Sequence, residues 1–296
     1  MSQRLWRAAL AASLVTGLCA LPGASEALAQ RSRAVDPKLH VRIFEAASAP
    51  AQHAEARACV PEGWKIVSGG ARVEWTGPGA LLTASYPEAN CWVARSKDHI
   101  AADTHRVFAY AVAIQDPSNQ WDVAVDEMTS GYASHPEASF EASRPGYVMT
   151  GGGARVNWET DPSHAGQIVT PVGSLLTASY PDGEQAWAAR AKDHIKISRA
   201  SVTVYVISLK ARSGAKLSTA IFTGQSQVSD APAASVSVPA PWTMIGGGAR
   251  VNWHGIGNLL TASYPDGAAS WSGVGKAHLE PSPANLTVYA IGVRLE

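Results

Sequence analysis

The sequence has no excess of charge of either sign. Its 24 basic residues balance its 24 acidic residues, and only 16% of all residues are charged. A chain without a basic excess or a polybasic run lacks the electrostatic features that favour nucleic acid or an anionic membrane, so we expect neither as a partner. Beyond the N-terminal segment no apolar run is long enough to cross a bilayer, and we expect no stable membrane insertion.

Motifs of established catalytic chemistry are also missing. The chain contains no Gly-x-Ser-x-Gly elbow, no His-Glu-x-x-His sequence and no glycine loop that ends in Gly-Lys-Ser/Thr. Enzymes usually concentrate their chemistry in one site, whereas binding proteins gain avidity by repetition. The sequence therefore favours binding over catalysis, and we expect neither a cofactor nor a resident metal.

The first residues have the pattern of an export signal. Arg4 and Arg7 precede an apolar stretch, Ala8 to Leu21, and Ala27-Leu28-Ala29 supplies small residues at a cleavage point. We predict a signal peptide over residues 1–29 and an N-terminal extension over 30–40. The predicted location is secreted or periplasmic.

The three cysteines agree with export. Cys19 lies in the predicted signal peptide, which leaves Cys59 and Cys91. Aligned on the repeated motifs, the two positions read Cys59/Cys91, then Ala142/Ala186, then Ser237/Ser270. Matched substitution indicates contact, so we predict a Cys59–Cys91 disulfide in an oxidising compartment. The chain-entropy model gives it about 3–4 kcal/mol of stabilisation.

Most of the remaining sequence is one unit written three times. The motif Gly-Gly-Ala-Arg-Val-Glu/Asn-Trp ends at Trp75, Trp158 and Trp253, and each copy continues with Leu-Leu-Thr-Ala-Ser-Tyr-Pro. A fixed period predicts one structural unit per copy. We place repeat one at 41–118, repeat two at 119–213 and repeat three at 214–296. Repeat two carries an insertion of 11 residues within Glu159–Ser174.

The local patterns indicate β-structure. Runs such as Val202–Ile207 are β-branched and aromatic, the prolines at 87, 181 and 265 stop strands, and Asp-Gly pairs after two of them predict hairpin turns. We expect four or five strands per repeat. The stretch Trp121–Met128 is the one weak helix candidate, and Trp121, which lies between repeats, is expected to be exposed.

Three sequential β units predict pseudo-threefold symmetry. We predict an all-β, β-prism-like fold with three sheets around an axis, and three small β-sandwiches in tandem are the alternative. The glycine triplets lack the features of a phosphate loop. We interpret them as places where backbones approach closely or a strand is bulged.

The candidate binding residues are those that recur near the aromatic positions. A Lys-x-His pair follows a Trp in every repeat, and an Arg stands in every glycine motif. Aromatic faces pack on sugar C–H groups while polar side chains bond the hydroxyls. The predicted ligand contacts are Arg72, Trp92, Lys97 and His99, then Arg155, Trp187, Lys192 and His194, then Arg250, Trp271, Lys276 and His278.

Other roles for these residues stay open. The Lys-x-His pairs fit a polar strand end with structural contacts, and the three histidines could meet on the axis and bind Zn²⁺. The arginines fit either structural ion pairs, for which Asp98 and Asp193 are possible partners, or the binding of anionic groups.

The order Pro-Gly-aromatic, Gly-Gly-Gly-Ala, Ala-Ser-Tyr-Pro, Trp and Val-Tyr-Ala-Ile resembles a repeat of exported bacterial proteins. It also resembles the β-rich receptor-binding tips of phage tail fibres, and residues 145–207 are its clearest copy. The architectural analogy is to β-prism lectins. The resemblance implies recognition of carbohydrate or a cell-surface polymer. The alternatives are a secreted polymer-degrading hydrolase or lyase with a site near the insertion, at Asp161 and His164, and a structural envelope protein.

Overall fold

The computed structural model describes residues 39–158 and 173–296, and all regular elements among them are β-strands. Repeat one forms β1 (Val41–Ala47), β2 (Glu55–Cys59), β3 (Trp64–Glu74), β4 (Leu81–Glu88), β5 (Cys91–Lys97) and β6 (Arg106–Gln115). Repeat two forms β7 (Trp121–Thr129), β8 (Glu137–Glu141), β9 (Val148–Asn157), β10 (Leu175–Pro181), β11 (Ala186–Lys192) and β12 (Ser201–Ala211). Repeat three forms β13 (Leu217–Gln225), β14 (Ala233–Ser237), β15 (Thr243–Asn252), β16 (Leu259–Pro265), β17 (Ser270–Lys276) and β18 (Asn285–Leu295).

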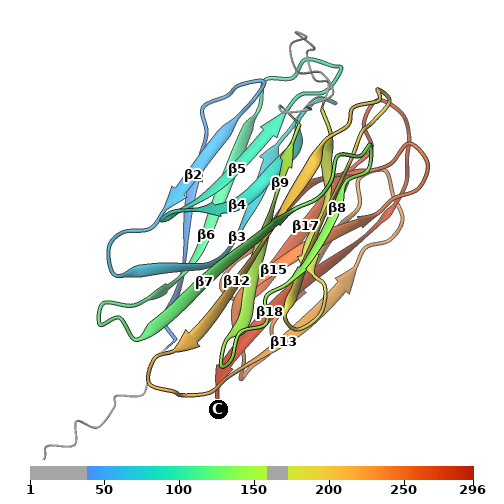
Figure 1. The fold of residues 1–296 in the computed structure, drawn as a ribbon. Helices are drawn as coiled ribbons and strands as arrows, with labels where there is room; N and C mark the ends of the chain where they lie inside the picture. Colours follow the sequence, from blue (N-terminus) through green and yellow to red (C-terminus); the bar gives the residue numbers. More distant parts are fainter. Residues whose placement is uncertain (1–38, 159–172) are drawn as a thin grey trace, which may run out of the picture. The chain divides into compact units, whose positions relative to one another are not determined.

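These strands make three six-stranded antiparallel sheets, and each sheet is shared by two repeats (Figure 1). The first sheet has the order β2-β5-β4-β9-β12-β7, from repeats one and two. The second has the order β8-β11-β10-β15-β18-β13, from repeats two and three. The third has the order β14-β17-β16-β3-β6-β1, from repeats three and one. Every repeat thus gives three strands to each of two sheets.

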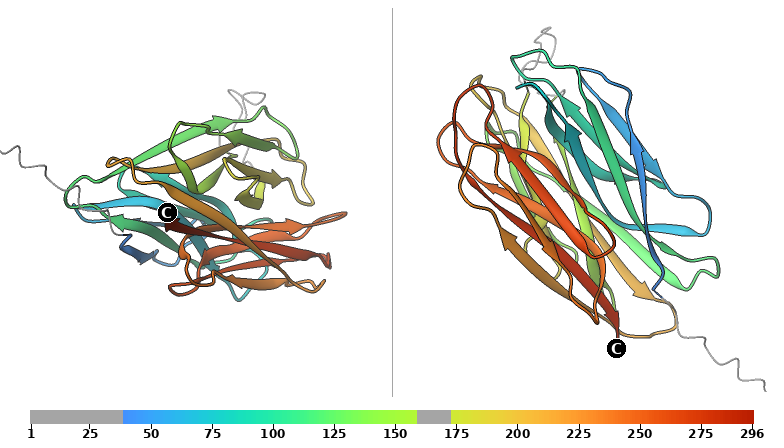
Figure 2. Two further views of the ribbon diagram at one scale, coloured as in Figure 1. Left: turned by 90° about the horizontal axis from the view of Figure 1, so that it is seen from below. Right: turned by 180° about the vertical axis from the view of Figure 1, so that it is seen from behind.

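This exchange confirms the predicted all-β fold with three related units. In tandem sandwiches each sheet would belong to a single repeat, so that alternative does not apply. The blue-to-cyan, green-to-yellow and orange-to-red segments can be followed in two further views (Figure 2). The predicted strand count per repeat was too low, because the two strands that precede each glycine motif carry little sequence pattern.

A tryptophan from each repeat anchors the shared core. Trp92, Trp187 and Trp271 are almost fully buried. Each indole Nε1 donates a hydrogen bond of 2.9–3.0 Å to the serine of Thr-Ala-Ser-Tyr-Pro, namely Ser85, Ser179 and Ser263. The repeated serine is therefore the polar partner of the core indole, which satisfies a donor that would be costly to bury alone.

The glycine triplets lie where backbones approach closely, as predicted. A Cβ on Gly153 would lie 2.6 Å from the carbonyl oxygen of Ser85, in repeat one. A Cβ on Gly70 would likewise lie against the carbonyl oxygen of Ser263, and one on Gly248 against that of Ser179. Each of these serines belongs to a neighbouring repeat. Bulges interrupt the ladders directly before these glycines. Glycine is thus required at the boundary between repeats.

The disulfide prediction is confirmed, with one correction to its alignment. Cys59 and Cys91 are bonded, and they face each other in the β2–β5 ladder. In repeat three Ser237 faces Ser270, as expected. In repeat two, however, Ala186 faces Glu141 and not Ala142. The turn between β8 and β9 is one residue longer than its counterparts, which shifted the motif-based alignment.

Two further expectations concern Trp121 and the hairpins. Trp121 opens strand β7 and is 1% exposed, so the expectations of a helix and of an exposed indole were wrong. The Asp-Gly turns join β10 to β11 and β16 to β17, with positive φ at Gly183 and Gly267.

The 11-residue insertion lies outside the described residues except at its C-terminal edge, and so do Asp161 and His164. Within the described part of the chain, no helix has the length and hydropathy needed to cross a membrane.

Candidate functional site

The recurring lysines are buried links between repeats. Lys97, Lys192 and Lys276 are 2–4% exposed. Each ammonium lies over the indole of the following repeat in cyclic order, with Nζ-to-centroid distances of 4.8 Å to Trp158, 4.8 Å to Trp253 and 4.2 Å to Trp75. Burial lowers the pKa of Lys97 and of Lys276 to about 8.

Backbone carbonyls complete the lysine sites. Lys276 Nζ donates to the carbonyl of Gly77 at 2.8 Å, and Lys192 Nζ donates to those of Asp193 and Ile256. Each lysine of this set is thus held by protein groups from the next repeat, and the desolvation of its charge is offset by cation–π and carbonyl contacts.

The recurring histidines meet, as one hypothesis predicted. The rings of His99, His194 and His278 are buried, and their centroids are 5.0–5.8 Å apart. His99 Nε2 lies 2.7 Å from the carbonyl of His194, and His194 Nε2 lies 2.8 Å from that of His278. Both nitrogens therefore donate to the next repeat. The third contact, between His278 and the backbone of His99, is less well formed than these two.

This geometry does not suit zinc. Two of the three Nε2 atoms are directed at carbonyl oxygens, whereas zinc binding requires the nitrogen lone pairs to converge on one point. Among the described residues, no group of three or more potential ligands is placed to hold a metal ion. Burial, and then the neighbouring imidazoles, lower the pKa of His278 to about 3, and burial also lowers the pKa of His194.

Each histidine is followed by a strained turn. Ile100, Ile195 and Leu279 have φ of 61–64°, a region that branched side chains rarely adopt. The amide two residues after each histidine donates to the histidine carbonyl at 2.6–2.8 Å. These tight turns aim the carbonyls that accept the neighbouring imidazoles, so strain is retained where the three repeats meet.

The twelve predicted ligand contacts therefore fall into two groups. The three tryptophans, three lysines and three histidines are buried among protein groups. The three arginines, Arg72, Arg155 and Arg250, are partly exposed on the outer sheet faces. Their predicted role in ligand binding stays a prediction, and the arginines are the members of the set with room for a ligand.

Each arginine lies beside a stacked tyrosine pair that joins two repeats. The pairs are Tyr86–Tyr205, Tyr180–Tyr289 and Tyr264–Tyr110, each with centroids 5.3 Å apart. Arg155, Arg250 and Arg72 lie 5.8, 5.5 and 5.8 Å from the centroid of the first-named tyrosine of each pair. The guanidinium groups are thus held at the seams where one repeat meets the next.

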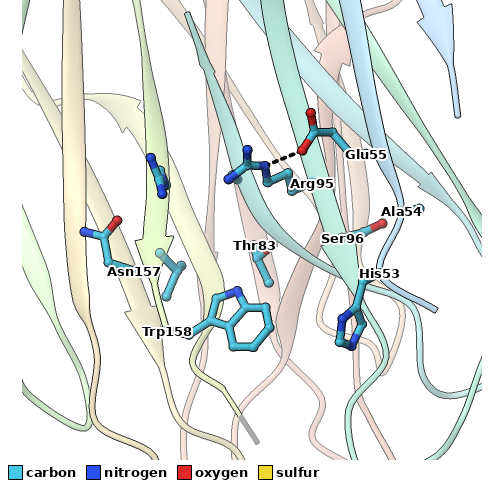
Figure 3. A pocket seen from close by; sticks show the side chains of 11 residues that line it. His53, Ala54, Glu55, Thr83, Arg95, Ser96, Asn157 and Trp158 are labelled. Carbon is cyan, nitrogen blue, oxygen red and sulfur yellow. Dashed lines mark hydrogen bonds and ion pairs between the residues drawn. The ribbon is translucent and has the colours of Figure 1, made fainter. Parts of the chain in front are cut away.

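The seam between repeats one and two contains a pocket of about 270 Å³, here called the first seam pocket (Figure 3). Its polar and aromatic lining is His53, Glu55, Thr83, Arg95, Ser96, Arg155, Asn157 and Trp158. Arg95 Nε donates to Glu55 at 2.8 Å, and His53 lies 3.4 Å from Asp98 and edge-on to Trp158.

The seam between repeats two and three contains the same constellation in a pocket of about 210 Å³, the second seam pocket. His135, Glu137, Thr177, Arg190, Arg250, Asn252 and Trp253 line it. Arg190 lies 3.4 Å from Glu137, and His135 lies 3.2 Å from Asp193 and edge-on to Trp253. Asp98 and Asp193 are thus partners of histidines, and the proposed ion pairs with the arginines were wrong.

The third seam, between repeats three and one, keeps Arg72, Trp75 and Thr261 but differs at most of the other pocket positions. Strand register aligns Ala231 with His53 and His135, Ala233 with Glu55 and Glu137, Val274 with Arg95 and Arg190, and Ala277 with Asp98 and Asp193. In the third seam both partners of the His–Asp contact and both partners of the Arg–Glu contact are therefore replaced together. In addition, Glu74 stands where the pockets have Asn157 and Asn252, and Phe108 where they have Thr203 and Thr287.

The asparagines show how these positions work together. In the first seam pocket Asn157 Nδ2 donates to Thr203 Oγ1 at 3.0 Å, and in the second Asn252 Nδ2 donates to Thr287 Oγ1 at 3.0 Å. In the third seam the Arg72 guanidinium instead covers Phe108, 4.2 Å from its centroid. Six positions thus differ together between the two pockets and the third seam.

Sequence reasoning missed this constellation because its positions are divided between two repeats and two of them lie before the glycine motif. His53 and Glu55 belong to repeat one, but Arg155, Asn157 and Trp158 come from repeat two. The available signal was the parallel change at positions 231, 233, 274 and 277 of repeat three, where apolar residues replace the two pairs.

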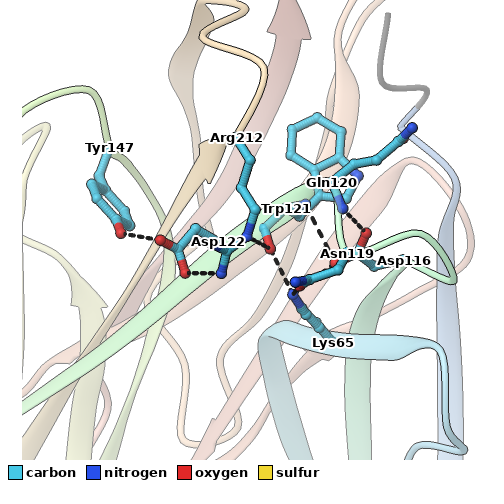
Figure 4. Close-up of polar contacts among 8 residues, drawn as sticks. All are labelled: Lys65, Asp116, Asn119, Gln120, Trp121, Asp122, Tyr147 and Arg212. Atoms are coloured by element: carbon cyan, nitrogen blue, oxygen red, sulfur yellow. Dashed lines mark hydrogen bonds and ion pairs between the residues drawn. The ribbon is translucent and has the colours of Figure 1, made fainter. Parts of the chain in front are cut away.

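A second polar cluster, at the junction of repeats one and two, has a structural role (Figure 4). Lys65 Nζ lies 2.7 Å from buried Asp116 and donates to the carbonyl of Trp121 at 2.6 Å. Arg212 and Tyr147 both donate to Asp122, at 2.9 and 2.8 Å. The cluster fixes the connection that buries Trp121.

No protein-family model matches the chain, and no curated protein matches it at a significant level.

Proposed function

We propose that this protein binds carbohydrate or a cell-surface polymer through the first and second seam pockets. The observation that carries the proposal is the coordinated difference between seams. Two seams keep two ion pairs, an asparagine and a threonine, while the third replaces all of them. Residues that only stabilised the fold would be needed equally at all three seams.

The chemistry of the pockets suits a sugar. Each offers a partly exposed indole, an imidazole, an amide and charged groups that converge from two repeats. Ligand pockets for larger molecules are roughly 300–1,000 Å³. Volumes of about 270 and 210 Å³ suit a single sugar unit or the end of a chain. Two such pockets on one chain would give avidity on a repetitive polymer.

The setting agrees with this role. A disulfide between Cys59 and Cys91 is typical of exported proteins, and the N-terminal pattern is that of a signal peptide. We therefore propose that the protein acts outside the cytoplasm, where cell-surface polymers are found.

The variants that test this proposal replace pocket residues with those found at the same positions of the third seam. The variant His53→Ala, Glu55→Ala, Arg95→Val gives the first seam pocket the residues of the third seam, and His135→Ala, Glu137→Ala, Arg190→Val does so for the second. Because the third seam folds with these residues, the variants should keep the native melting temperature within a few degrees. Binding to a panel of immobilised polysaccharides should be lost when both pockets are converted.

The matched control carries the same three kinds of substitution at exposed positions outside the pockets: His40→Ala, Glu62→Ala and Arg106→Val. It should bind as the native protein does. Retention of no polysaccharide by the native protein, or equal binding by the native and doubly converted proteins, would overturn the proposal. The first result would favour a structural envelope role.

A further inference from the structure

The charge arrangement of the seam pockets indicates the class of ligand, and this step rests on the proposed function. We propose that both pockets bind an acidic sugar unit, one that carries a carboxylate or a sulfate, with Arg155 and Arg250 as the counter-charges.

In the first seam pocket the other charged groups pair among themselves. Arg95 pairs with Glu55, and His53 lies beside Asp98. Arg155 has no carboxylate within 4.0 Å among the described residues, and its neighbours are the rings of Tyr86 and Tyr205. Burial, and then Glu127, raise the pKa of Tyr205 to about 12, so this phenol stays neutral and supplies no compensating charge.

The second seam pocket repeats this arrangement. Arg190 pairs with Glu137, His135 lies beside Asp193, and Arg250 has tyrosine rings as its neighbours. Among described residues, no carboxylate comes within ion-pair distance of Arg250. As far as the described residues go, each pocket therefore carries one guanidinium without a carboxylate partner.

In the third seam an acid, Glu74, stands near the arginine, outside ion-pair distance but close enough to act on the pKa of Arg72. Glu74 follows Arg72 by two positions on strand β3, so both side chains share one face of the sheet. Burial lowers the pKa of Arg72, but Tyr110, Tyr264 and Glu74 outweigh it and the net shift is upward. The pockets have Asn157 and Asn252 at this position, so the compensating acid is absent where the other pocket groups are present.

An uncompensated guanidinium suits an acidic sugar for geometric reasons too. The planar fork of arginine donates two parallel hydrogen bonds to a carboxylate or sulfate, which fixes orientation as well as charge. The tyrosine pair limits the movement of the guanidinium. The nearby asparagine uses Nδ2 on a threonine hydroxyl, which leaves its Oδ1 to accept from a sugar hydroxyl.

The experiment measures binding of the full-length mature protein to polygalacturonate, dextran sulfate and neutral dextran by biolayer interferometry. The variant Asn157→Glu/Asn252→Glu places the third-seam acid in both pockets. We expect it to bind the acidic polymers at least tenfold more weakly than the native protein does. The control Gln115→Glu/Gln227→Glu adds the same charge at exposed positions outside the pockets and should stay within twofold of native.

The outcomes separate the two proposals. Equal binding of dextran and the acidic polymers, with no effect of Asn157→Glu/Asn252→Glu, would overturn the acidic-ligand inference and leave the proposed function standing. Binding of no polymer by the native protein would overturn the proposed function. Comparison of polygalacturonate with dextran sulfate tells a carboxylate from a sulfate. Should the glutamate variant not fold, Arg155→Gln/Arg250→Gln provides the same comparison, and undiminished acidic-polymer binding would overturn the inference.

Discussion

The axis and the seams of this molecule use the same three repeats in different ways. At the axis all three copies agree: a buried indole bonded to a serine, a lysine over the next repeat's indole, and a histidine in the central cluster. At the seams two copies agree and the third differs at six positions. Residues that are the same in all three repeats are those that the fold requires. Residues that differ together in one seam serve a role other than folding.

The differences also respect physical pairing. An arginine left without its glutamate would retain a partly desolvated charge without a partner, so losing both costs less than losing one. Ala233 and Val274 face each other in the third seam just as Glu55 and Arg95 do in the first. The third seam is therefore a working interface between repeats without the pocket groups.

The largest effect is expected at the axis. Trp271→Ala removes a fully buried indole and leaves Ser263 without its partner, which should lower the free energy of unfolding by about 3–5 kcal/mol. The triple conversion of the first seam pocket should change it by less than about 1 kcal/mol, since its residues are partly exposed. Urea denaturation of both variants measures the two free energies of unfolding. A similar loss of stability in both would contradict the distinction between axis and seam.

A smaller effect is expected where the repeats cross. Gly153→Ala places a methyl group 2.6 Å from the carbonyl oxygen of Ser85, and neither backbone can move freely, so a loss of about 1–3 kcal/mol is expected. Gly131→Ala is the control, because a Cβ there meets nothing within 4 Å. Thermal melting of the two variants should differ clearly, and equal melting temperatures would contradict the close approach.

Acid should weaken the histidine cluster. Burial holds the pKa of His278 at about 3, below its unfolded value near 6.5, so the folded ring stays neutral while the unfolded one gains a proton. The contribution of His278 to the free energy of unfolding is fully present above pH 6.5. It is lost as the pH falls below this value, and the loss is about 2 kcal/mol at pH 5. His278→Gln should flatten the dependence of melting temperature on pH between 7 and 5.

The matched control for that measurement is His53→Ala, whose imidazole is 60% exposed. Its melting temperature should follow pH as the native one does. If His278→Gln leaves the slope unchanged, the histidine cluster is not the acid-sensitive element.

The sequence predicted the features that repetition made visible. The threefold unit, the all-β class, the disulfide and the close approach at the glycines all follow from patterns that recur at fixed spacing. Trp121 was misjudged because no other repeat has a tryptophan at this position, and its burial comes from packing in the shared hydrophobic core. The alignment at Ala142 failed on a turn that is one residue longer.

The candidate site was less accessible to sequence reasoning, for a physical reason. Recurrence of the lysine and histidine residues suggested ligand contacts, but recurrence arose from their role in joining repeats. The first seam pocket combines β2 and β5 of repeat one with β9 of repeat two, and the second combines β8 and β11 with β15, so both depend on the exchange of strands between sheets. Only the sheet order brings Arg155 beside Glu55 and Arg95.

The number of ligands bound per chain tests the central claim most directly. Isothermal titration with a short acidic oligosaccharide, an oligogalacturonate, should give two sites for the native protein, one after conversion of either seam pocket and none after conversion of both. A native stoichiometry of three, or one that does not fall as the pockets are converted, would contradict the assignment of binding to the two seams that differ from the third.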